Sequence, residues 1–353
     1  MKKFLCAALA ATMLFSMSAC GGAKSELALV TDKGTIDDKS FNQGAWEGLV
    51  AYADENNKSN KYYQPTEQSD DAYLAAIDNA VTNGAKVVVT PGYLFEVPIY
   101  KAQSDYPDVK FILLDGTPHD ADYSDYKTAS NTVAISYAEE QAGYLAGYAA
   151  VKDGYRSLGF MGGMAVPAVI RYGYGFLKGA DDAAVELGLA QGDITVNYHY
   201  TGDFAATPET QTMAASWYQN GVEVVFACGG AVGNSVMAAA SVAGKYVIGV
   251  DVDQSSESGT VITSAMKGLK ASVYDCVKKY YNDAFPGGQN IIYDAANDGV
   301  SLAMDTAKFN SFTQEDYDAV FGRLAAGSVS IPKDTDATNP SALTFSILTV
   351  NEI

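Results

Sequence analysis

The sequence predicts an α/β protein with two doubly wound domains, each built on a parallel sheet. Three observations support this: nearly continuous apolar strands, amphipathic helical stretches between those strands, and a length of 353 residues. Apolar strands that alternate with helices are typical of parallel sheets covered on both faces. At roughly 150 residues per domain, the length favours two domains. The number of strands is also too large for one sheet.

Strands and helices alternate along both halves of the chain. Short runs rich in Val, Leu, Ile and Phe predict strands at 27–31, 86–90 and 111–115 in the first half. Between them we expect a helix over 40–56 and a second over 96–104. The second half repeats this rhythm, with strands expected at 158–161, 194–198, 222–227 and 246–250. The repetition favours two sheets of similar construction.

Polar residues or glycines follow many of these strands directly. The strand ends with this property are Thr31-Asp32, Thr90-Pro91-Gly92, Asp115-Gly116, Gly162-Gly163, Gly229-Gly230 and Asp251. In open α/β sheets, ligands bind at the carboxyl ends of the strands. A single Asp at such a place usually caps the next helix. So many polar ends on two sheets instead predict one cleft lined from both sides.

Composition excludes several classes of function. With 48% hydrophobic and 18% charged residues, 33 Gly and 10 Pro, the chain is neither disordered nor collagen-like. Its 42 acidic and 23 basic residues give a formal charge of -19, which phosphate backbones repel, so we expect no nucleic-acid partner. No apolar run reaches the roughly 18 residues of a spanning helix, which excludes an integral channel or permease.

The N-terminus predicts an exported, lipid-anchored protein. Lys2 and Lys3 precede the apolar stretch 4–19, and Cys20 follows the small residues Ser18 and Ala19. This order resembles a bacterial lipobox, with a signal peptide over 1–19, a lipidated Cys20 and a tether over 20–25. An ordinary signal peptide with a chance Cys is the alternative. The anchor would hold the protein on the extracytoplasmic face of the cell membrane.

The motifs of common enzymes are missing. The sequence contains no G-x-x-x-x-G-K-[ST], G-x-S-x-G, H-E-x-x-H or C-x-x-C. Its 2 histidines make a His-based metal site or triad hard to build. We therefore expect neither an enzyme nor a cofactor or metal. Cys228 and Cys276 remain in the mature chain, where buried free thiols are favoured over a disulfide.

Several motifs together resemble one family. The segment 31–43, Thr-Asp-Lys-Gly-Thr-Ile-Asp-Asp-Lys-Ser-Phe-Asn-Gln, is similar to the opening signature of the basic membrane protein family. These are substrate-binding lipoproteins related to the purine nucleoside receptor of spirochaetes. Further matching segments follow in order at 106–108, 139–147, 159–163, 175–179, 248–255 and 263–267. The resemblance covers essentially the whole mature chain.

The resemblance implies a type I periplasmic-binding-protein fold. Such a fold has two lobes, three crossovers between them and a ligand cleft between the lobes. It implies a first lobe of 26–133 plus 252–286 and a second lobe of 134–251 plus 287–353. The strand 261–264 and the helix beyond it would then belong to the first lobe. The tail, with a helix near 313–326, would finish on the second.

The family's base-binding residues match four positions of this sequence. Phe41 and Phe204 match the two aromatics that sandwich the base, and Asp32 and Asn42 match the groups that bind its edge. Stacking a base on an aromatic ring is worth about 1–3 kcal/mol. Core packing is the alternative for Phe41. Capping of the first helix is the alternative for the polar residues, and it also competes for Asp37 and Asp38.

The ribose-binding residues match at the ends of later strands. Asp251 matches the carboxylate that accepts hydrogen bonds from the ribose hydroxyls, and Lys267 matches the cleft lysine. Backbone amides near Gly230 can add donors, because glycine allows close approach. The chain departs from many members at 205–207, where Ala-Ala-Thr replaces an acidic residue. This departure bears on which ligand is bound.

The residues and the family resemblance together predict a lipid-anchored binding protein that captures a nucleoside and presents it to an ABC permease. The resemblance to purine nucleoside receptors favours a purine. We expect a monomer. One alternative keeps the fold and binds a sugar or another small metabolite. A second is a sensor that reports its ligand to a membrane kinase. An enzyme with this architecture is disfavoured by the missing nucleophile, cofactor and metal motifs.

Overall fold

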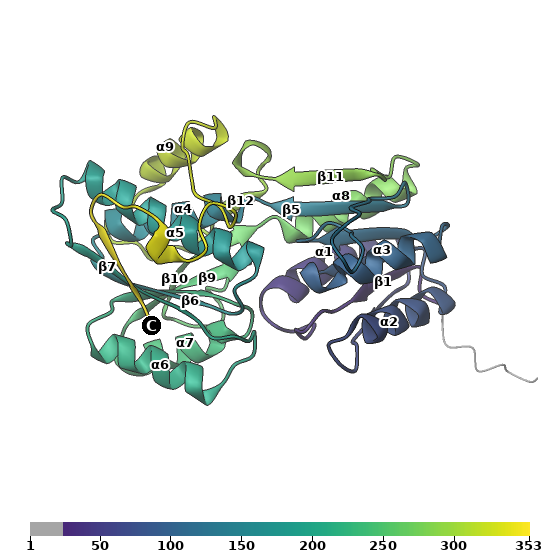
Figure 1. Cartoon of the computed structure of the whole chain (residues 1–353), viewed down its shortest axis with the longest axis horizontal. Helices are drawn as coiled ribbons and strands as arrows, with labels where there is room; N and C mark the ends of the chain where they lie inside the picture. The colour runs from purple at the N-terminus through teal and green to yellow at the C-terminus, as the bar shows by residue number, and fades with distance from the viewer. Residues whose placement is uncertain (1–23) are drawn as a thin grey trace, which may run out of the picture.

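The structure, a computed structural model, describes residues 24–353, which form two lobes side by side (Figure 1). The expected signal peptide and Cys20 lie outside these residues. Each lobe is a sheet between two layers of helices. Alternate residues of one strand therefore enter different cores: Leu27 and Leu29 face one, and Ala28 and Val30 face the other. This burial on both faces explains the continuous apolar strands of the sequence.

The first lobe contains a parallel sheet with the strand order β11-β5-β4-β3-β1-β2. Its strands are β1 (Leu27–Val30), β2 (Asn60–Tyr63), β3 (Val87–Pro91), β4 (Lys110–Leu114), β5 (Thr132–Tyr137) and β11 (Gln289–Tyr293). Its helices are α1 (Phe41–Glu55), α2 (Asp70–Thr82), α3 (Glu96–Asp105), α8 (Leu269–Tyr281) and the short η1 (Tyr93–Phe95). Helices α1 and α8 pack on one face, and α2 and α3 on the other.

The second lobe contains a sheet with the order β12-β10-β9-β8-β6-β7-β13, parallel except for β12. Its strands are β6 (Ser157–Gly162), β7 (Ile194–Tyr200), β8 (Val224–Cys228), β9 (Tyr246–Asp251), β10 (Val261–Lys267), β12 (Val300–Leu302) and β13 (Leu348–Glu352). Its helices are α4 (Glu139–Lys152), α5 (Pro167–Glu186), α6 (Pro208–Gln219), α7 (Val232–Ala243) and α9 (Gln314–Ala325). Two short helices, η2 (Ala295–Asn297) and η3 (Pro340–Ala342), lie in the C-terminal segment.

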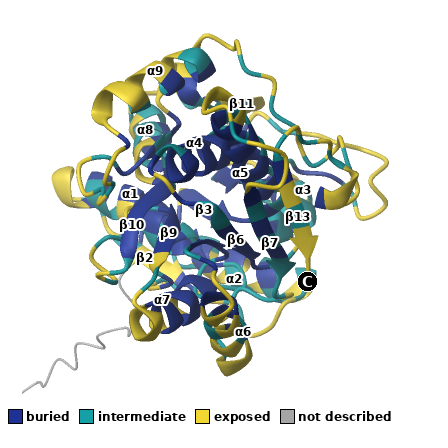
Figure 2. Cartoon of the chain, turned by 90° about the vertical axis from the view of Figure 1, so that its left-hand side faces the viewer, coloured by how far each residue is buried: buried dark blue, intermediate teal, exposed yellow. Residues whose placement is uncertain are grey.

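Burial follows this layering. Figure 2 shows buried strands in the second lobe between α4 and α5 on one face and α6 and α7 on the other; α4 and α5 are themselves largely buried, whereas α6 and α7 have exposed outer surfaces. Cys228 and Cys276 are both buried and free, as expected. No helix within 24–353 combines the length and the apolarity that a membrane span requires.

The chain passes between the lobes three times, after β5, β10 and β11, which confirms the expected fold class. Three segments, however, lie on the other lobe from the one expected. The first lobe continues beyond residue 133 to the end of β5, which pairs with β4. Strand β10, within 252–286, pairs with β9 in the second sheet. Strand β11, within 287–353, pairs with β5 in the first sheet. An apolar strand sequence does not encode which of two sheets the strand joins.

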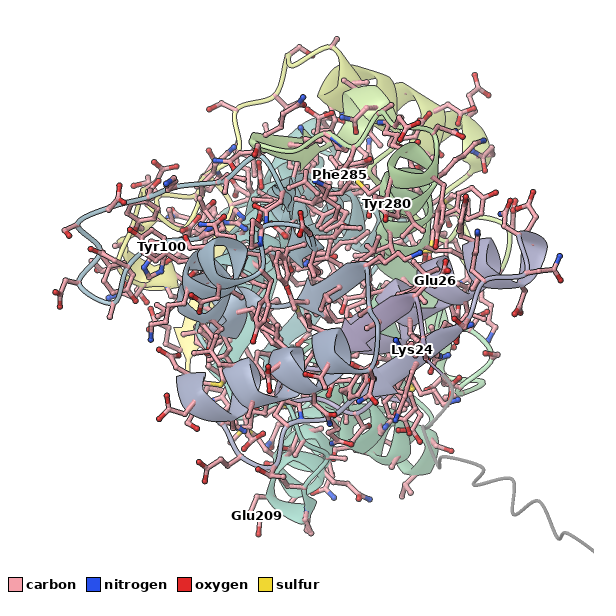
Figure 3. The ribbon with its side chains drawn as sticks, turned by 90° about the vertical axis from the view of Figure 1, so that its right-hand side faces the viewer. Lys24, Glu26, Tyr100, Glu209, Tyr280 and Phe285 are labelled. Carbon is pink, nitrogen blue, oxygen red and sulfur yellow. The ribbon has the colours of Figure 1, made fainter. Side chains whose placement is uncertain are left out.

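Helix α8 returns the chain to the first lobe and is fastened there by Glu26 (Figure 3). The hydroxyl of Tyr281 donates to Glu26 at 2.8 Å, and Nζ of Lys86 lies 3.2 Å from the same carboxylate. The Tyr281 ring also stacks on Tyr52 of α1, with centroids 5.4 Å apart. These contacts join the C-terminal end of α8 to the start of the first sheet.

Helices α4 and α5 touch backbone to backbone. A Cβ atom on Gly147 would lie 2.0 Å from the carbonyl oxygen of Phe176. A Cβ atom on any of three more glycines would lie 2.0 to 2.1 Å from a carbonyl oxygen of the other helix: Gly143, Gly175 and Gly179. Only glycine permits this approach, which brings Cα–H groups against carbonyl oxygens. The contact fixes Glu139, the first residue of α4, relative to Arg171 on α5.

We expect Gly147→Ala to lower the free energy of unfolding by about 3 kcal/mol, because the new methyl group meets backbone that cannot move aside. The matched control is Gly322→Ala in α9, where a Cβ meets nothing within 4 Å. That change should raise stability by up to about 1 kcal/mol through helix propensity. Urea unfolding followed by circular dichroism measures both variants. Equal stabilities for the two variants would contradict the close helix contact.

Candidate functional site

A cavity of about 420 Å³ lies between the two lobes, at the carboxyl ends of the strands. All seven binding residues expected from the sequence line it: Asp32, Phe41, Asn42, Phe204, Gly230, Asp251 and Lys267. The first three follow β1 or begin α1, and the other four follow or end β7, β8, β9 and β10. Residues far apart in the chain therefore meet in one place, contributed by both lobes.

A hydrogen-bonded turn holds Asp32 at the wall of the first lobe. Its Oδ1 accepts from the backbone N–H of Gly34 at 2.8 Å and from Nδ2 of Asn42 at 2.9 Å. The same Nδ2 donates to Asp38 at 2.9 Å, and Asp38 accepts from the backbone N–H groups of Ser40, Asn42 and Gln43. Asp38 therefore caps α1, and Asn42 ties that cap to Asp32. Burial raises the pKa of Asp32 to about 6, which leaves it mostly ionised at neutral pH.

Phe41 and Phe204 reach the cavity from opposite lobes. The Phe41 ring lies over the ammonium group of Lys267, with Nζ 4.9 Å from its centroid. The Phe204 ring lies on Gly163, where a Cβ would come within 2.4 Å of the ring. Gly230 adopts a positive φ of 54° beside the Phe204 backbone. The glycines that follow β6 and β8 thus make room for the second aromatic.

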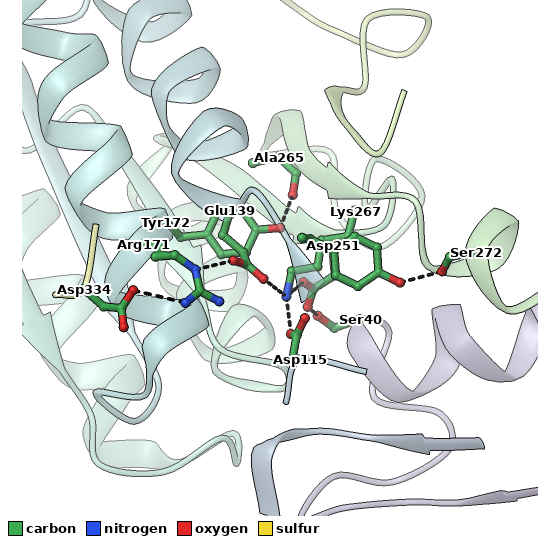
Figure 4. A network of polar contacts seen from close by, with 11 residues as sticks. Ser40, Asp115, Glu139, Arg171, Tyr172, Asp251, Ala265, Lys267, Ser272 and Asp334 are labelled. Carbon is green, nitrogen blue, oxygen red and sulfur yellow. Dashed lines mark hydrogen bonds and ion pairs between the residues drawn. The ribbon is translucent and has the colours of Figure 1, made fainter. Parts of the chain in front are cut away.

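The ammonium group of Lys267 is enclosed by three carboxylates (Figure 4). Its Nζ lies 3.1 Å from Glu139 and 3.9 Å from Asp251, and it forms a closer ion pair with Asp115. The side chain of Lys267 is only 3% exposed. Two further aromatic rings lie beside it, those of Tyr137 and Tyr172. The cluster occupies the end of the cavity nearest the crossovers, because Lys267 and Glu139 flank two of them.

Burial and pairing compete in setting the charges of this cluster. Burial raises the pKa of Glu139, but Lys267 and Arg171 together outweigh it and hold that pKa below its ordinary value. For Asp115 and Asp251 burial prevails, and the pKa of each carboxyl is raised. Burial lowers the pKa of Lys267, but the neighbouring carboxylates raise it by more. The pKa of Lys267 is therefore above its ordinary value, and the ammonium group stays protonated.

Arg171 extends the cluster to the C-terminal segment. Its Nε donates to Glu139 at 2.6 Å, and a terminal nitrogen donates to Asp334 at 3.1 Å. One chain of charges therefore runs from β4 in the first lobe, through the crossovers, to α5 and the tail of the second (Figure 4). The first two crossovers are tied together through side chains as well as through the backbone.

Two carboxylates of the cluster are held in a rare backbone conformation. Asp115 and Asp251 have positive φ values of 55° and 66°, which non-glycine residues seldom adopt. Such residues gather at ligand sites, where the surrounding structure maintains the strain. Oδ1 of Asp115 is buried and makes no hydrogen bond within the described residues. Oδ2 of Asp251 accepts from Ser40 of the first lobe at 2.5 Å.

The sequence placed Asp115 at the predicted cleft without assigning it a binding role, and it did not point to Glu139 or Arg171. Asp115 stood among the polar strand ends, and that position was the available signal for it. Glu139 opens a helix, where an acidic residue also fits the helix dipole and so draws no notice. Arg171 lies on a long helix, with nothing in its neighbours to mark it. Both are recognisable only once the crossovers bring α4, α5 and β10 together.

Comparisons with known proteins agree with this architecture. A sequence model of the family described as "ABC transporter substrate-binding protein PnrA-like" matches residues 25–334. The chain is 31% identical to "ABC transporter nucleoside-binding protein BmpA" of Lactococcus lactis, over 88% of this chain and 91% of that protein. It is 27% identical to "Basic membrane protein A1" of Borrelia garinii, over 96% of this chain and 98% of the relative.

Solved structures show the same fold. A solute-binding protein of an ABC transporter system from Aeropyrum pernix superposes with a TM-score of 0.77 at 19% identity, covering 90% of this chain and 95% of the other. A second, from Conexibacter woesei, gives 0.68 at 22% identity, covering 87% and 98%. Proteins of this kind bind a solute outside the cytoplasm and release it to a permease without converting it. The chain belongs to the Bmp family, the PnrA-like substrate-binding proteins of ABC transporters.

Proposed function

We propose that this protein binds a nucleoside, preferably a purine nucleoside, and delivers it to an ABC permease. The observation that carries the proposal is that one cavity has two kinds of lining. Two aromatic rings from opposite lobes, Phe41 and Phe204, line it together with Asp32, and we call this part the aromatic end. Phe41 also borders the charged end, where buried carboxylates surround the ammonium group of Lys267. A nucleoside likewise joins a flat base to a polyhydroxylated sugar.

The base fits the aromatic end. Rings contributed by facing lobes can stack on both faces of a base when the lobes close. Asp32 is mostly ionised at neutral pH and accepts hydrogen bonds from ring N–H or amino groups at the base edge. Asn42 supports this contact by holding Asp32 in place. The preference for a purine rests on the resemblance to purine nucleoside receptors.

The ribose fits the charged end. Oδ1 of Asp115, which is buried without a hydrogen bond, can accept one from a sugar hydroxyl. Asp251 can accept from the neighbouring hydroxyl, and Lys267 can donate to a sugar oxygen. Of this cluster, Asp115, Asp251 and Lys267 line the cavity, so a ligand there meets two carboxyl groups and one ammonium group. Carboxyl oxygens repel a phosphate group and accept hydrogen bonds from hydroxyls, which suits a neutral nucleoside.

Delivery requires the two lobes to close on the ligand and the protein to stay near its permease. Ligand binding between the lobes would shift the population toward a closed form, whose surface the permease recognises. We propose that a monomer attached through lipid on Cys20 performs this task on the extracytoplasmic face of the membrane. The lipobox-like order of Ser18, Ala19 and Cys20 supports the anchor.

The first test identifies the ligand directly. We expect the protein, purified under native conditions and then denatured, to release inosine, guanosine, adenosine or a close relative. Closure of the lobes slows release, so bound ligand survives purification. Mass spectrometry of the released fraction measures this. Recovery of a sugar or another metabolite instead would keep the fold and overturn the nucleoside assignment. An empty cleft is followed by a thermal-shift panel, and a panel in which no nucleoside raises the melting temperature would also contradict the assignment.

Phe41→Ala should weaken nucleoside binding tenfold or more, because one stacking partner of the base is worth about 1–3 kcal/mol. Isothermal titration with the nucleoside found above measures the change. Phe41→Leu is the companion variant, since it keeps apolar cover over Lys267 but removes the flat ring. Thermal unfolding without ligand checks that both variants fold. A loss below threefold in both variants would indicate that the base does not stack on Phe41.

Cys20→Ala should release the protein from the membrane, because the lipid chain and not a spanning helix would hold it there. Incorporation of radioactive palmitate measures the modification. We expect the wild-type protein to be labelled and the Cys20→Ala protein to remain unlabelled. Cys6→Ala lies within the same segment and is the matched control, with normal labelling expected. Equal membrane attachment and labelling of the Cys20→Ala protein would refute the anchor.

A further inference from the structure

One ion pair joins the lobes across the cavity on the side away from the crossovers. Nζ of Lys33, in the loop after β1, lies 2.7 Å from Oδ2 of Asp203, in the loop after β7. Both residues line the cavity. The Lys33 side chain is 18% exposed and that of Asp203 is 43% exposed, so the pair lies where the cavity meets the surface.

Strand order shows why this position matters. Crossovers leave β5 and β11 at one edge of the first sheet, and β10 and β12 at one edge of the second. Strands β1 and β7 lie toward the opposite edges. The other polar contacts between the lobes include Ser40 with Asp251 and Lys267 with Asp115, both at the charged end of the cavity. The strands that precede Lys33 and Asp203 therefore lie away from the sheet edges at which the chain crosses between the lobes.

The same carboxylate shapes the loop that carries Phe204. Oδ1 of Asp203 accepts from the backbone N–H of Phe204 at 2.6 Å and from that of Ala205 at 3.0 Å. The hydroxyl of Thr201 donates to the backbone carbonyl of Asp203 at 2.8 Å and closes the turn. One oxygen of Asp203 therefore orders the turn beside the aromatic ring, and the other bonds to the opposite lobe.

We propose that Asp203 is a positioning residue that couples lobe closure to the placement of Phe204, with Lys33 as its partner across the opening. When the lobes close, the ion pair forms and holds the turn with the Phe204 ring seated against Gly163. When the pair breaks, the lobes separate and the ring loses its fixed place over the ligand. The pair thus slows ligand release. The role of Phe204 in this inference rests on the proposed function; the pair across the opening does not.

The size of the effect follows from the partial exposure of the pair. Ion pairs of this kind contribute modestly, and their loss should speed ligand dissociation about two- to fivefold. Association should change little, because the open form already lacks the contact. Salt screens the pair, so added NaCl should speed ligand dissociation from the wild-type protein. Dissociation from variants that lack the pair, such as Lys33→Met, should not change with salt.

The first experiment measures the lobes without any ligand. Glu67 and Glu209 are exposed and lie on different lobes, so spin labels on Glu67→Cys and Glu209→Cys report the distance between the lobes. The native Cys228 and Cys276 are buried and should not take up the label. After removal of bound ligand by unfolding and refolding, pulsed electron resonance should show longer distances in Lys33→Met than in the wild type. Lys279→Met, which breaks a 2.7 Å ion pair within α8, is the control and should change nothing. Identical distances in Lys33→Met and the wild type would overturn the proposal.

The second experiment distinguishes the two roles of Asp203, the hydrogen bonds of Oδ1 within the turn and the ion pair of Oδ2 with Lys33. Asp203→Asn keeps an acceptor for the turn and loses the charge, so stopped-flow displacement of bound inosine should match Lys33→Met. Asp203→Ala also loses the turn and should release inosine faster still. The reversed pair, Lys33→Asp with Asp203→Lys, should regain part of the slow release relative to Lys33→Asp alone.

The outcomes of the two experiments are distinct. The coupling is overturned if Asp203→Asn releases inosine at the wild-type rate while Asp203→Ala releases it faster. Asp203 would then only order the turn. If the wild-type protein binds no inosine or other nucleoside, the proposed function fails. The ligand-free distances would still decide whether Lys33 and Asp203 hold the lobes together.

Discussion

The buried ammonium group of Lys267 is the interaction on which the rest of the site depends. Its charge would be costly in this interior without the carboxylates of Asp115, Glu139 and Asp251. These residues come from β4, α4 and β9, so one cation fixes elements of both lobes relative to the crossovers. The same requirement places negative charge at one end of the cavity. The carboxylates that stabilise the buried ammonium group are thus the same groups that we propose accept hydrogen bonds from the ligand.

Much of the fold could be predicted from the sequence because both faces of each sheet are buried. The runs 87–89 and 247–250 are apolar and lie between helical stretches, so these strands follow from composition and from the alternation with helices. Their assignment to a lobe does not. β10 follows β9 in the chain and pairs beside it, whereas β11 returns to β5 across the molecule. Such pairings depend on where helices α8 and α4 lead the chain, which local patterns do not encode.

The candidate site was predictable in its strand-end members and at the start of α1, but not in its members on α4 and α5. Asp32, Gly230, Asp251 and Lys267 follow or end strands, and topology brings such ends together in any sheet of this type. Glu139 and Arg171 lie on helices, and their roles appear only through the glycine contact between α4 and α5. Residues at strand ends of the candidate site are therefore easier to recognise in a sequence than the helical residues that hold them in place.

The two sides of the cavity differ in how firmly they are held, and this difference suits a receptor that must open. On the crossover side, a buried ion pair joins Asp115 of the first lobe to Lys267 of the second, and packing of α4 on α5 fixes the residues around Lys267. On the far side, the lobes are joined by the part-exposed ion pair between Lys33 and Asp203, whose strength is comparable to thermal energy. A rigid side and a weak side define a hinge. The ligand then needs to supply only a small difference in free energy to shift the lobes from open to closed.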